Sequence, residues 1–313
     1  MDIHAFQSFR DRLVENCSKV IVGKDAAIEQ LVICLLAGGH VLLEDVPGTG
    51  KTMLLRALSA SLGGRFRRVQ FTPDLLPSDL TGIHFYNQKE SEFTFRPGPL
   101  FADFILADEL NRATPRTQSA LLEVMEELQI TVDGQTWPME QPYMVMATQN
   151  PVESYGTFPL PEAQLDRFFL RLRLGYPTRE QEISVLRRPD AKHILENLKP
   201  VVTRDELLRL RAQYPEVRVG DDVAGYLMDI VEKTRSDELV ALGVSTRGAL
   251  ALYRAAQLRA AISGRDYAIP EDVKTEALVV LPHRLVLNGH SHLDAEGYLK
   301  RVLEDLPVPL DRP

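Results

Sequence analysis

The stretch from Leu42 to Thr52, LLEDVPGTGKT, constrains this 313-residue chain more than any other. It combines a short apolar run, a glycine-bearing loop and the start of a helical pattern that ends at Gly63 and Gly64. A strand that leads through a loop into a helix directs backbone N–H groups and the positive end of the helix dipole to one point. We therefore expect this stretch to bind the phosphates of a nucleotide.

The loop matches the phosphate-binding pattern GxxxxGK[ST] except at its first position, where Asp45 stands in place of glycine. Asp adopts left-handed backbone conformations more readily than most residues, so we expect the tight turn to be kept. In this pattern Lys51 supplies a positive charge for the β- and γ-phosphates, and the Thr52 hydroxyl binds Mg²⁺. The predicted nucleotide-binding residues of this stretch are Pro47, Gly48, Thr49, Gly50, Lys51, Thr52 and Met53.

Composition and charge narrow the possible classes. With 44% hydrophobic and 26% charged residues, the chain has material for one large or two smaller globular domains. The formal net charge of −8 argues against nucleic acid as a partner. Cys17 and Cys34 have no CxxC spacing, and the amphipathic, charged N-terminus is not typical of a signal peptide. We expect a reduced cytoplasmic protein without a membrane span.

The order of the expected elements divides the chain in two. Strand-like and helical segments alternate up to Tyr176, and helical patterns follow. We predict an α/β nucleotide-binding domain with a parallel sheet over residues 1–176 and a helical domain over residues 177–313. Two features interrupt the alternation: a turn-rich insertion at 73–99 and a hairpin at 128–142 with a two-residue Asp133-Gly134 turn.

Two further strands end in polar residues at the edge where open α/β sheets bind ligands. The run FILADE ends in Asp108 and Glu109, which we expect to hold Mg²⁺ through water and to activate the attacking water, respectively. The run ATQN ends in Asn150, whose neutral amide can orient that water or contact the γ-phosphate. Taken alone, Asn150 followed by Pro151 indicates a turn. Together with GTGKT, these residues predict ATP hydrolysis.

Two arginines fit the same chemistry. Arg167, in QLDRF, is placed to reach the phosphates of a neighbouring subunit, although an ion pair with Asp166 would also explain it. Arg247, in STRGAL, lies at the start of a helix in the second domain. It either couples the γ-phosphate to movement of that domain or is simply a solvated arginine. Arg112 and Arg116 compete with Arg167 for the role at the subunit boundary.

Other candidate sites have weaker support. The basic strand RFRRVQFT at 65–72 is expected to be solvated rather than to bind nucleic acid. The segment HSH at 290–292 with Asp294 is too short a signature for a metal site. Trp137, after the hairpin turn, either packs or contacts a substrate.

Four segments together resemble the MoxR family of AAA+ ATPases: LLEDVPGTGKT, FILADELNRATPRTQSALLEVMEE, MVMATQNPVESYGTFPLPEAQLDRF and GVSTRGALAL. The resemblance covers nearly the whole chain, and acidic residues before the loop are common in such sequences. It implies an α/β fold of the AAA+ P-loop type, with a five-stranded parallel sheet between helical layers and an all-helical lid domain. The insertion at 73–99 then corresponds to a helix-2 insert and the hairpin at 128–142 to a pre-sensor-1 hairpin.

The resemblance also implies roles for individual residues. It places Walker A at Lys51 and Thr52, Walker B at Asp108 and Glu109, sensor 1 at Asn150, the arginine finger at Arg167, sensor 2 at Arg247 and the segment near adenine at Val22 and Gly23. Whether Arg247 acts on its own subunit or on a neighbour stays open.

The resemblance further implies cofactors and partners. Such proteins use ATP and Mg²⁺, assemble as rings that are usually hexameric, and are thought to remodel protein partners in the manner of chaperones. The partners are often von Willebrand factor A-domain proteins, and some family members act in metal-site maturation. These properties are expectations for this chain.

Three alternatives stay open at this point. A chelatase-type subunit that drives metal insertion shares nearly every motif. A nucleic-acid motor of the same clade is disfavoured, because the hairpin QITVDGQTW contains no Lys or Arg. A non-enzymatic nucleotide-binding scaffold is disfavoured by the intact Lys51, Asp108, Glu109 and Arg167.

Overall fold

The computed structural model describes residues 1–45, 48–149, 156–187, 191–289 and 293–309. Within them, five strands form a parallel sheet in the order β2-β5-β8-β1-β9. The strands are β1 (Val41–Glu44), β2 (Phe66–Gln70), β5 (Phe104–Asp108), β8 (Met144–Gln149) and β9 (Leu170–Leu172). Because parallel strands end at one edge, this order brings the ends of β1, β5 and β8 together.

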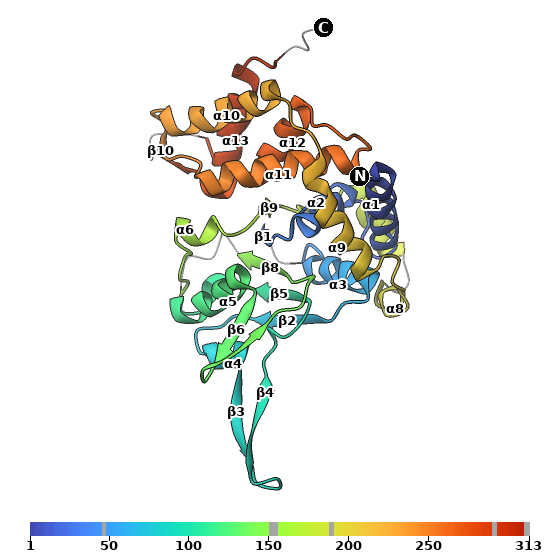
Figure 1. Cartoon of the computed structure of the whole chain (residues 1–313), viewed down its shortest axis with the longest axis vertical. Coiled ribbons are helices and arrows are strands. Elements are labelled where there is room, and N and C mark those ends of the chain that lie inside the picture. The colour runs from blue at the N-terminus through green and yellow to red at the C-terminus, as the bar shows by residue number, and fades with distance from the viewer. Residues whose placement is uncertain (46–47, 150–155, 188–190, 290–292, 310–313) are drawn as a thin grey trace.

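Helices cover both faces of the sheet (Figure 1). Val41 and Leu43 of β1 belong to one buried cluster, together with residues of the helices on that side, whereas Leu42 belongs to a second cluster with α5. The period-2 alternation of a strand thus separates two cores around one sheet. These helices are α1 (Ile3–Ser18), α2 (Asp25–Ala37) and α3 (Lys51–Leu62) on the first face and α5 (Pro115–Glu127) on the second.

The C-terminal part of the chain is mainly helical. Its elements are α7 (Arg179–Arg187), α8 (Ala191–Glu196), α9 (Arg204–Gln213), η2 (Tyr214–Glu216), α10 (Asp221–Ser236), α11 (Thr246–Ile262), α12 (Pro270–Val280), η3 (Pro282–Arg284) and α13 (Ala295–Asp305). Of these, α10 to α13 lie at the top of the view in Figure 1, whereas α8 lies beside α3 and α9 beside α2. The short antiparallel ribbon of β10 (Val240–Leu242) and β11 (Val286–Leu287) was not expected. No helix among the described residues is long and apolar enough to span a bilayer.

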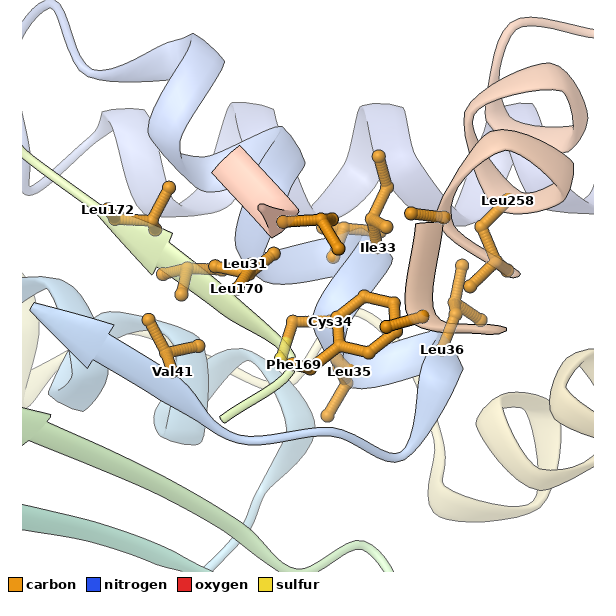
Figure 2. Packing of buried hydrophobic residues seen from close by; sticks show 14 of the residues in the cluster. Leu31, Ile33, Cys34, Leu35, Leu36, Val41, Phe169, Leu170, Leu172 and Leu258 are labelled. Atoms are coloured by element: carbon orange, nitrogen blue, oxygen red, sulfur yellow. The ribbon is translucent and has the colours of Figure 1, made fainter. Parts of the chain in front are cut away.

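The helical part packs closely on the first helices of the chain. Figure 2 shows Leu258 of α11 next to Leu36 of α2, and both side chains are fully buried. One hydrophobic cluster therefore extends from α1 and α2 into α11 and α12. A boundary near residue 176 stays a prediction, because apolar packing is continuous across that position.

Two hairpins extend from the second face of the sheet. The insertion contains α4 (Pro77–Thr81) and the hairpin of β3 (Gly82–Asn87) and β4 (Glu92–Pro97), which projects far below the body in Figure 1. The second hairpin joins β6 (Gln129–Val132) to β7 (Gln135–Pro138), with φ of 50° at Asp133 and 80° at Gly134 as a two-residue turn requires. Trp137 stacks on Phe95 at 4.4 Å, so packing is the role that the structure shows for it.

Candidate functional site

The loop before α3 has the geometry of an anion site. Gly48 and Gly50 have φ of 85° and 89°, a left-handed conformation that glycine adopts without strain. Gly50 is the N-cap of α3, and no side chain caps this end. The first N–H groups of a helix have no partner within the helix, so they can bind a phosphate at this point.

Asp45 is held in a way that the sequence did not indicate. Positive φ occurs at four non-glycine residues of the described chain, and Asp45 is not one of them, so the left-handed turn expected there is wrong. Its buried carboxylate instead accepts the N–H groups of Leu174 and Gly175, at 3.0 and 3.1 Å. The side chain thereby ties the phosphate-binding loop to the segment that follows β9.

A pocket of about 390 Å³ joins the loop to the carboxyl ends of the neighbouring strands. Most of the predicted nucleotide-binding residues meet there, with Asp108 and Glu109 opposite the start of α3. Of the predicted set, the pocket is lined by Gly48, Gly50, Lys51, Thr52, Met53, Asp108 and Glu109. The sequence analysis did not assign Arg68, Gln70 or Thr148, which also line it.

Lys51 lies inside this pocket with its ammonium group turned toward the loop. Its Nζ donates to the Asp45 carbonyl oxygen at 2.7 Å. Burial lowers the pKa of Lys51 from its ordinary value, and the charges of Asp45, Asp108 and Glu109 partly offset that effect. The Lys51 ammonium lies at the loop, where its positive charge can neutralise a bound phosphate.

Asp108, at the end of β5, is held by two different partners. Thr148 of β8 donates its hydroxyl to Oδ1 at 2.7 Å, which fixes the orientation of the carboxylate. Arg68 of β2 donates to Oδ2 at 2.6 Å in an ion pair. The carboxylate therefore has a cation beside it on the side of the pocket.

Glu109 has a φ of 56°, which is uncommon for a non-glycine residue. Its N–H donates to the Thr148 hydroxyl at 2.8 Å, and its carboxylate accepts from Gln70 at 2.7 Å and from Arg112 at 3.0 Å. Strain of this kind is kept where the surroundings determine the conformation, often at functional sites. Arg112, which was a candidate for the subunit boundary, thus forms an ion pair with Glu109 of its own chain.

The donor set of the pocket fits a magnesium nucleotide. Mg²⁺ prefers oxygen ligands such as the Thr52 hydroxyl and the Asp108 carboxylate, and both line the pocket. Lys51 and the start of α3 supply positive charge for the phosphates. Within the described part of the chain, no group of three or more His, Cys, Asp or Glu side chains forms a separate metal site.

Arg167 and Arg247 lie elsewhere, in a second pocket of about 450 Å³ that shares no lining residue with the first. Both bind the carboxylate of Glu126 at the end of α5, Arg167 at 3.1 Å and Arg247 at 2.6 Å. The structure therefore brings the two predicted arginines together but does not bring them to the phosphate loop of their own chain. Sequence reasoning missed Glu126.

Asp166 lies partly buried in a polar junction beside Arg167. It accepts from Arg284 of η3 at 2.8 Å and from Ser245, the N-cap of α11, at 2.9 Å. The sequence left open an ion pair between Asp166 and Arg167, but in the structure Asp166 binds Arg284 and Ser245, and Arg167 binds Glu126. The helix start that carries Arg247 is thus fixed to the segment that carries Arg167.

The remaining predicted residues are placed as follows. Val22 and Gly23 are outside both pockets, and the Gln181 side chain of α7 lies against Gly23. Thr49 lies in the loop between the two glycines. Arg116 lines a hollow beside the hairpins. Pro47, Asn150, His290 and His292 lie outside the described residues.

One signal in the sequence would have indicated two of the missed residues. Arg68 and Gln70 are two apart in β2, so their side chains share one face of the strand. Because β2 pairs with β5 in register, Gln70 is opposite Asp108. A face assignment for this strand would have placed both side chains at the pocket.

Known proteins agree with this architecture. A model of the ATPase family associated with various cellular activities (AAA) matches residues 40–170, and a model of the AAA lid domain matches residues 232–302. A solved structure of a candidate ATPase from Cytophaga hutchinsonii superposes with a TM-score of 0.90 at 37% identity and covers 98% of both chains. The expected AAA+ α/β fold with a helical lid is confirmed.

Several relatives match nearly the whole chain, and two of them are named MoxR. Chaperone MoxR1 of Mycobacterium tuberculosis is 41% identical over 96% of this chain and 82% of its own. Protein MoxR of Methylorubrum extorquens is 30% identical over 95% of this chain and 94% of its own. The uncharacterized protein YeaC of Bacillus subtilis is 50% identical over 96% and 95%. With its phosphate loop, its paired strand-end acids and these relatives, the chain belongs to the MoxR family of AAA+ ATPases.

Proposed function

We propose that this ATPase is a cytoplasmic ring of six copies, the arrangement usual for such proteins, that uses ATP hydrolysis to remodel or mature a protein partner. A von Willebrand factor A-domain protein is the partner class that we propose. The observation that carries the proposal is the meeting of Lys51, Thr52, Asp108 and Glu109 in one pocket, while Arg167 and Arg247 are paired in another.

In the proposed reaction each residue of the first pocket has one task. Lys51 neutralises charge on the β- and γ-phosphates, and Thr52 and Asp108 provide oxygens for Mg²⁺. Glu109 accepts a proton from the attacking water, and Gln70 holds its carboxylate in place until then. When bound, Mg²⁺ would neutralise negative charge on the phosphate oxygens.

The two arginines are proposed to act on the nucleotide of a neighbouring subunit. Each guanidinium is partly exposed, and the pocket that contains both is separate from the phosphate loop of the same chain. A cation supplied by a neighbour stabilises the charge that develops on the transferred phosphoryl group. This arrangement makes hydrolysis depend on assembly, and it assigns Arg247 a role in trans. Asn150 is proposed to position the attacking water, and Val22 and Gly23 to contact the adenine.

Mixed rings test the action in trans. Arg167→Ala should lower the hydrolysis rate by roughly 10³-fold or more, since that is the usual contribution of such an arginine. Adding Lys51→Ala subunits should restore part of the rate, because they offer an intact Arg167 to the intact pockets of the other variant. Absence of any recovery in mixtures that do assemble would refute the action in trans.

Partner capture tests the remodelling role. The Glu109→Gln variant should bind ATP and Mg²⁺ but hydrolyse little, because the base that accepts the proton from water is removed. It should therefore retain its partner, which mass spectrometry identifies against a matched sample without ATP. An A-domain protein supports the proposal, whereas chelatase subunits or nucleic acid would replace it.

A further inference from the structure

The Glu126 carboxylate binds both arginines at once, one on each oxygen. Its Oε2 is 3.1 Å from Arg167 Nη2, and its Oε1 accepts from Arg247 Nη2 at 2.6 Å. Arg167 also donates Nη1 to the Leu122 carbonyl oxygen of the same helix at 3.2 Å. Three separate parts of the chain thus meet at one carboxylate: α5, the segment that follows α6 (Glu162–Leu165), and the start of α11.

The pocket around this carboxylate carries an excess of positive charge. Arg167, Arg247, Arg254 and Arg284 line it, and Glu126 is the one acidic side chain among its lining residues. Arg284 is neutralised by Asp166, which leaves three guanidinium groups facing a single negative charge. A carboxylate between two guanidiniums has the geometry in which a phosphate group would bind, because both accept charge-assisted hydrogen bonds.

We propose that Glu126 is an internal competitor that occupies Arg167 and Arg247 until a phosphate group of the neighbouring subunit's nucleotide displaces it. The proposal rests on the function proposed above and adds its regulation. A terminal phosphate carries up to two negative charges and three acceptor oxygens, whereas Glu126 carries one charge and two oxygens. Displacement of Glu126 is therefore favourable when the neighbouring subunit holds a nucleotide with a terminal phosphate, and not when its site is empty.

This competition has a measurable consequence for assembly. In a subunit without a nucleotide-bearing neighbour, Glu126 satisfies the two arginines and lowers their attraction for other anions. Each subunit contact must then replace the two ion pairs of Glu126 before it gains those to the phosphate. Nucleotide-dependent assembly is weakened by that exchange, and removal of the carboxylate should strengthen it.

The test compares Glu126→Gln with Glu127→Gln in the full chain. Glu127 is the adjacent exposed residue of α5, with no ion pair in the described part of the chain and no place in the pocket lining. Sedimentation with a non-hydrolysable ATP analogue and Mg²⁺ gives the protein concentration at half-assembly. We expect Glu126→Gln to lower that concentration about tenfold, and Glu127→Gln to leave it unchanged.

A second variant, Glu126→Asp, keeps the proposal testable even if Glu126→Gln is less stable than the wild type. Glu126→Asp retains the charge but shortens the side chain by one methylene, so it should bind one arginine and give an intermediate midpoint. A midpoint for Glu126→Gln that is unchanged or higher would overturn the proposal. So would a lower kcat with an unchanged midpoint, which would make Glu126 a positioning residue.

Failure of this proposal is distinct from failure of the trans-acting role. If assembled Arg167→Ala and Arg247→Ala variants hydrolyse ATP at the wild-type rate, the arginines have no role in trans, whatever Glu126 does. If those variants are inactive and Glu126→Gln assembles as the wild type does, the arginines act but Glu126 does not compete for them.

Discussion

Arg68 and Asp108 form an ion pair at the carboxylate that is proposed to hold Mg²⁺. Arg68 is about half exposed, and its guanidinium also contacts Gln70, which in turn holds Glu109. The Arg68 guanidinium and the proposed Mg²⁺ would both bind the Asp108 carboxylate. Mg²⁺ must therefore either displace Arg68 or share Asp108 with it.

Removal of that competitor should change the magnesium requirement of nucleotide binding. We predict that Arg68→Gln lowers the Mg²⁺ concentration for half-maximal binding of a fluorescent ATP analogue several-fold at low salt, because one positive charge leaves the site. Arg67→Gln, an exposed neighbour in the same strand, is the matched control. If Arg68→Gln weakens nucleotide binding equally with and without Mg²⁺, Arg68 contacts the phosphates instead.

His40 is a buried residue whose protonation state is fixed by its neighbours. The Val145 N–H donates to Nδ1 at 3.1 Å, and Nε2 is 3.0 Å from the Met125 carbonyl oxygen, so the proton is on Nε2 and the ring is neutral. The pKa of His40 is lowered to about 4, mainly by burial; the hydrogen bond to Met125 opposes this shift and the nearby charge of Arg211 adds to it.

The stability of the protein should fall with acidification because of this residue. In the unfolded chain His40 binds a proton near pH 6.5, whereas in the folded chain it does so near pH 4, so the unfolded state binds more protons between these values. We predict a loss of about 1.6 kcal/mol in the free energy of unfolding from pH 6.5 to 5, from this residue alone. Urea unfolding should show a shallower pH slope for His40→Gln than for the wild type or for exposed His4→Gln.

At the scale of elements, aromatic packing joins the two hairpins. Trp137 of β7 stacks on Phe95 of β4 with an interplanar angle of 10°, and Phe101 meets the same indole edge-on. His84 of β3 and Asp133 of the β6–β7 turn add an ion pair at 2.8 Å when the histidine is protonated. The projecting hairpin is therefore connected through side chains to the hairpin beside it.

The single tryptophan makes this connection observable by fluorescence. We predict that Phe95→Ala shifts the Trp137 emission to longer wavelength, because the stacked ring no longer shields the indole from water. Phe93→Ala should not, since Phe93 is 71% exposed and pairs with Tyr86 away from the indole. An unchanged spectrum for Phe95→Ala would show that the stack does not persist in solution.

At the scale of the whole molecule, the buried Arg284 holds the lid on the core. Its side chain is 2% exposed and donates to Asp166 and to the carbonyl oxygens of Phe168 and Phe169. Asp166 in turn accepts from Ser245 of α11. The lid and the arginine-bearing segment are thus joined by polar contacts as well as by the apolar packing of α2 and α11.

Loss of one partner of this pair should be costly. We predict that Asp166→Ala lowers the free energy of unfolding by about 3–5 kcal/mol, because it leaves the buried Arg284 charge without compensation. The control is Arg218→Gln, which removes an exposed pair with Asp266 and should cost less than about 1 kcal/mol. Equal midpoints for the two variants in urea unfolding would contradict the prediction.

The sequence predicted what depends on neighbours along the chain. Strands, helices and both hairpins follow from periodicity and turn residues, and Lys51, Asp108 and Glu109 follow from strand ends at a common edge. The association of Glu126 with Arg167 and Arg247 could not be predicted in this way, because the three residues come from three elements whose packing angles no local pattern specifies. The roles assigned to Asn150, Arg167 and Arg247 stay predictions.

Asp45 departs from the phosphate-loop consensus, and its side chain has a structural role that glycine could not fill. A glycine at that position would match the general phosphate-loop pattern, yet it would remove the carboxylate that binds the backbone at Leu174 and Gly175. Those residues lead directly from the last sheet strand into the lid. In this chain, a change of Asp45 to the consensus glycine would therefore detach the proposed phosphate-binding loop from the segment that follows β9.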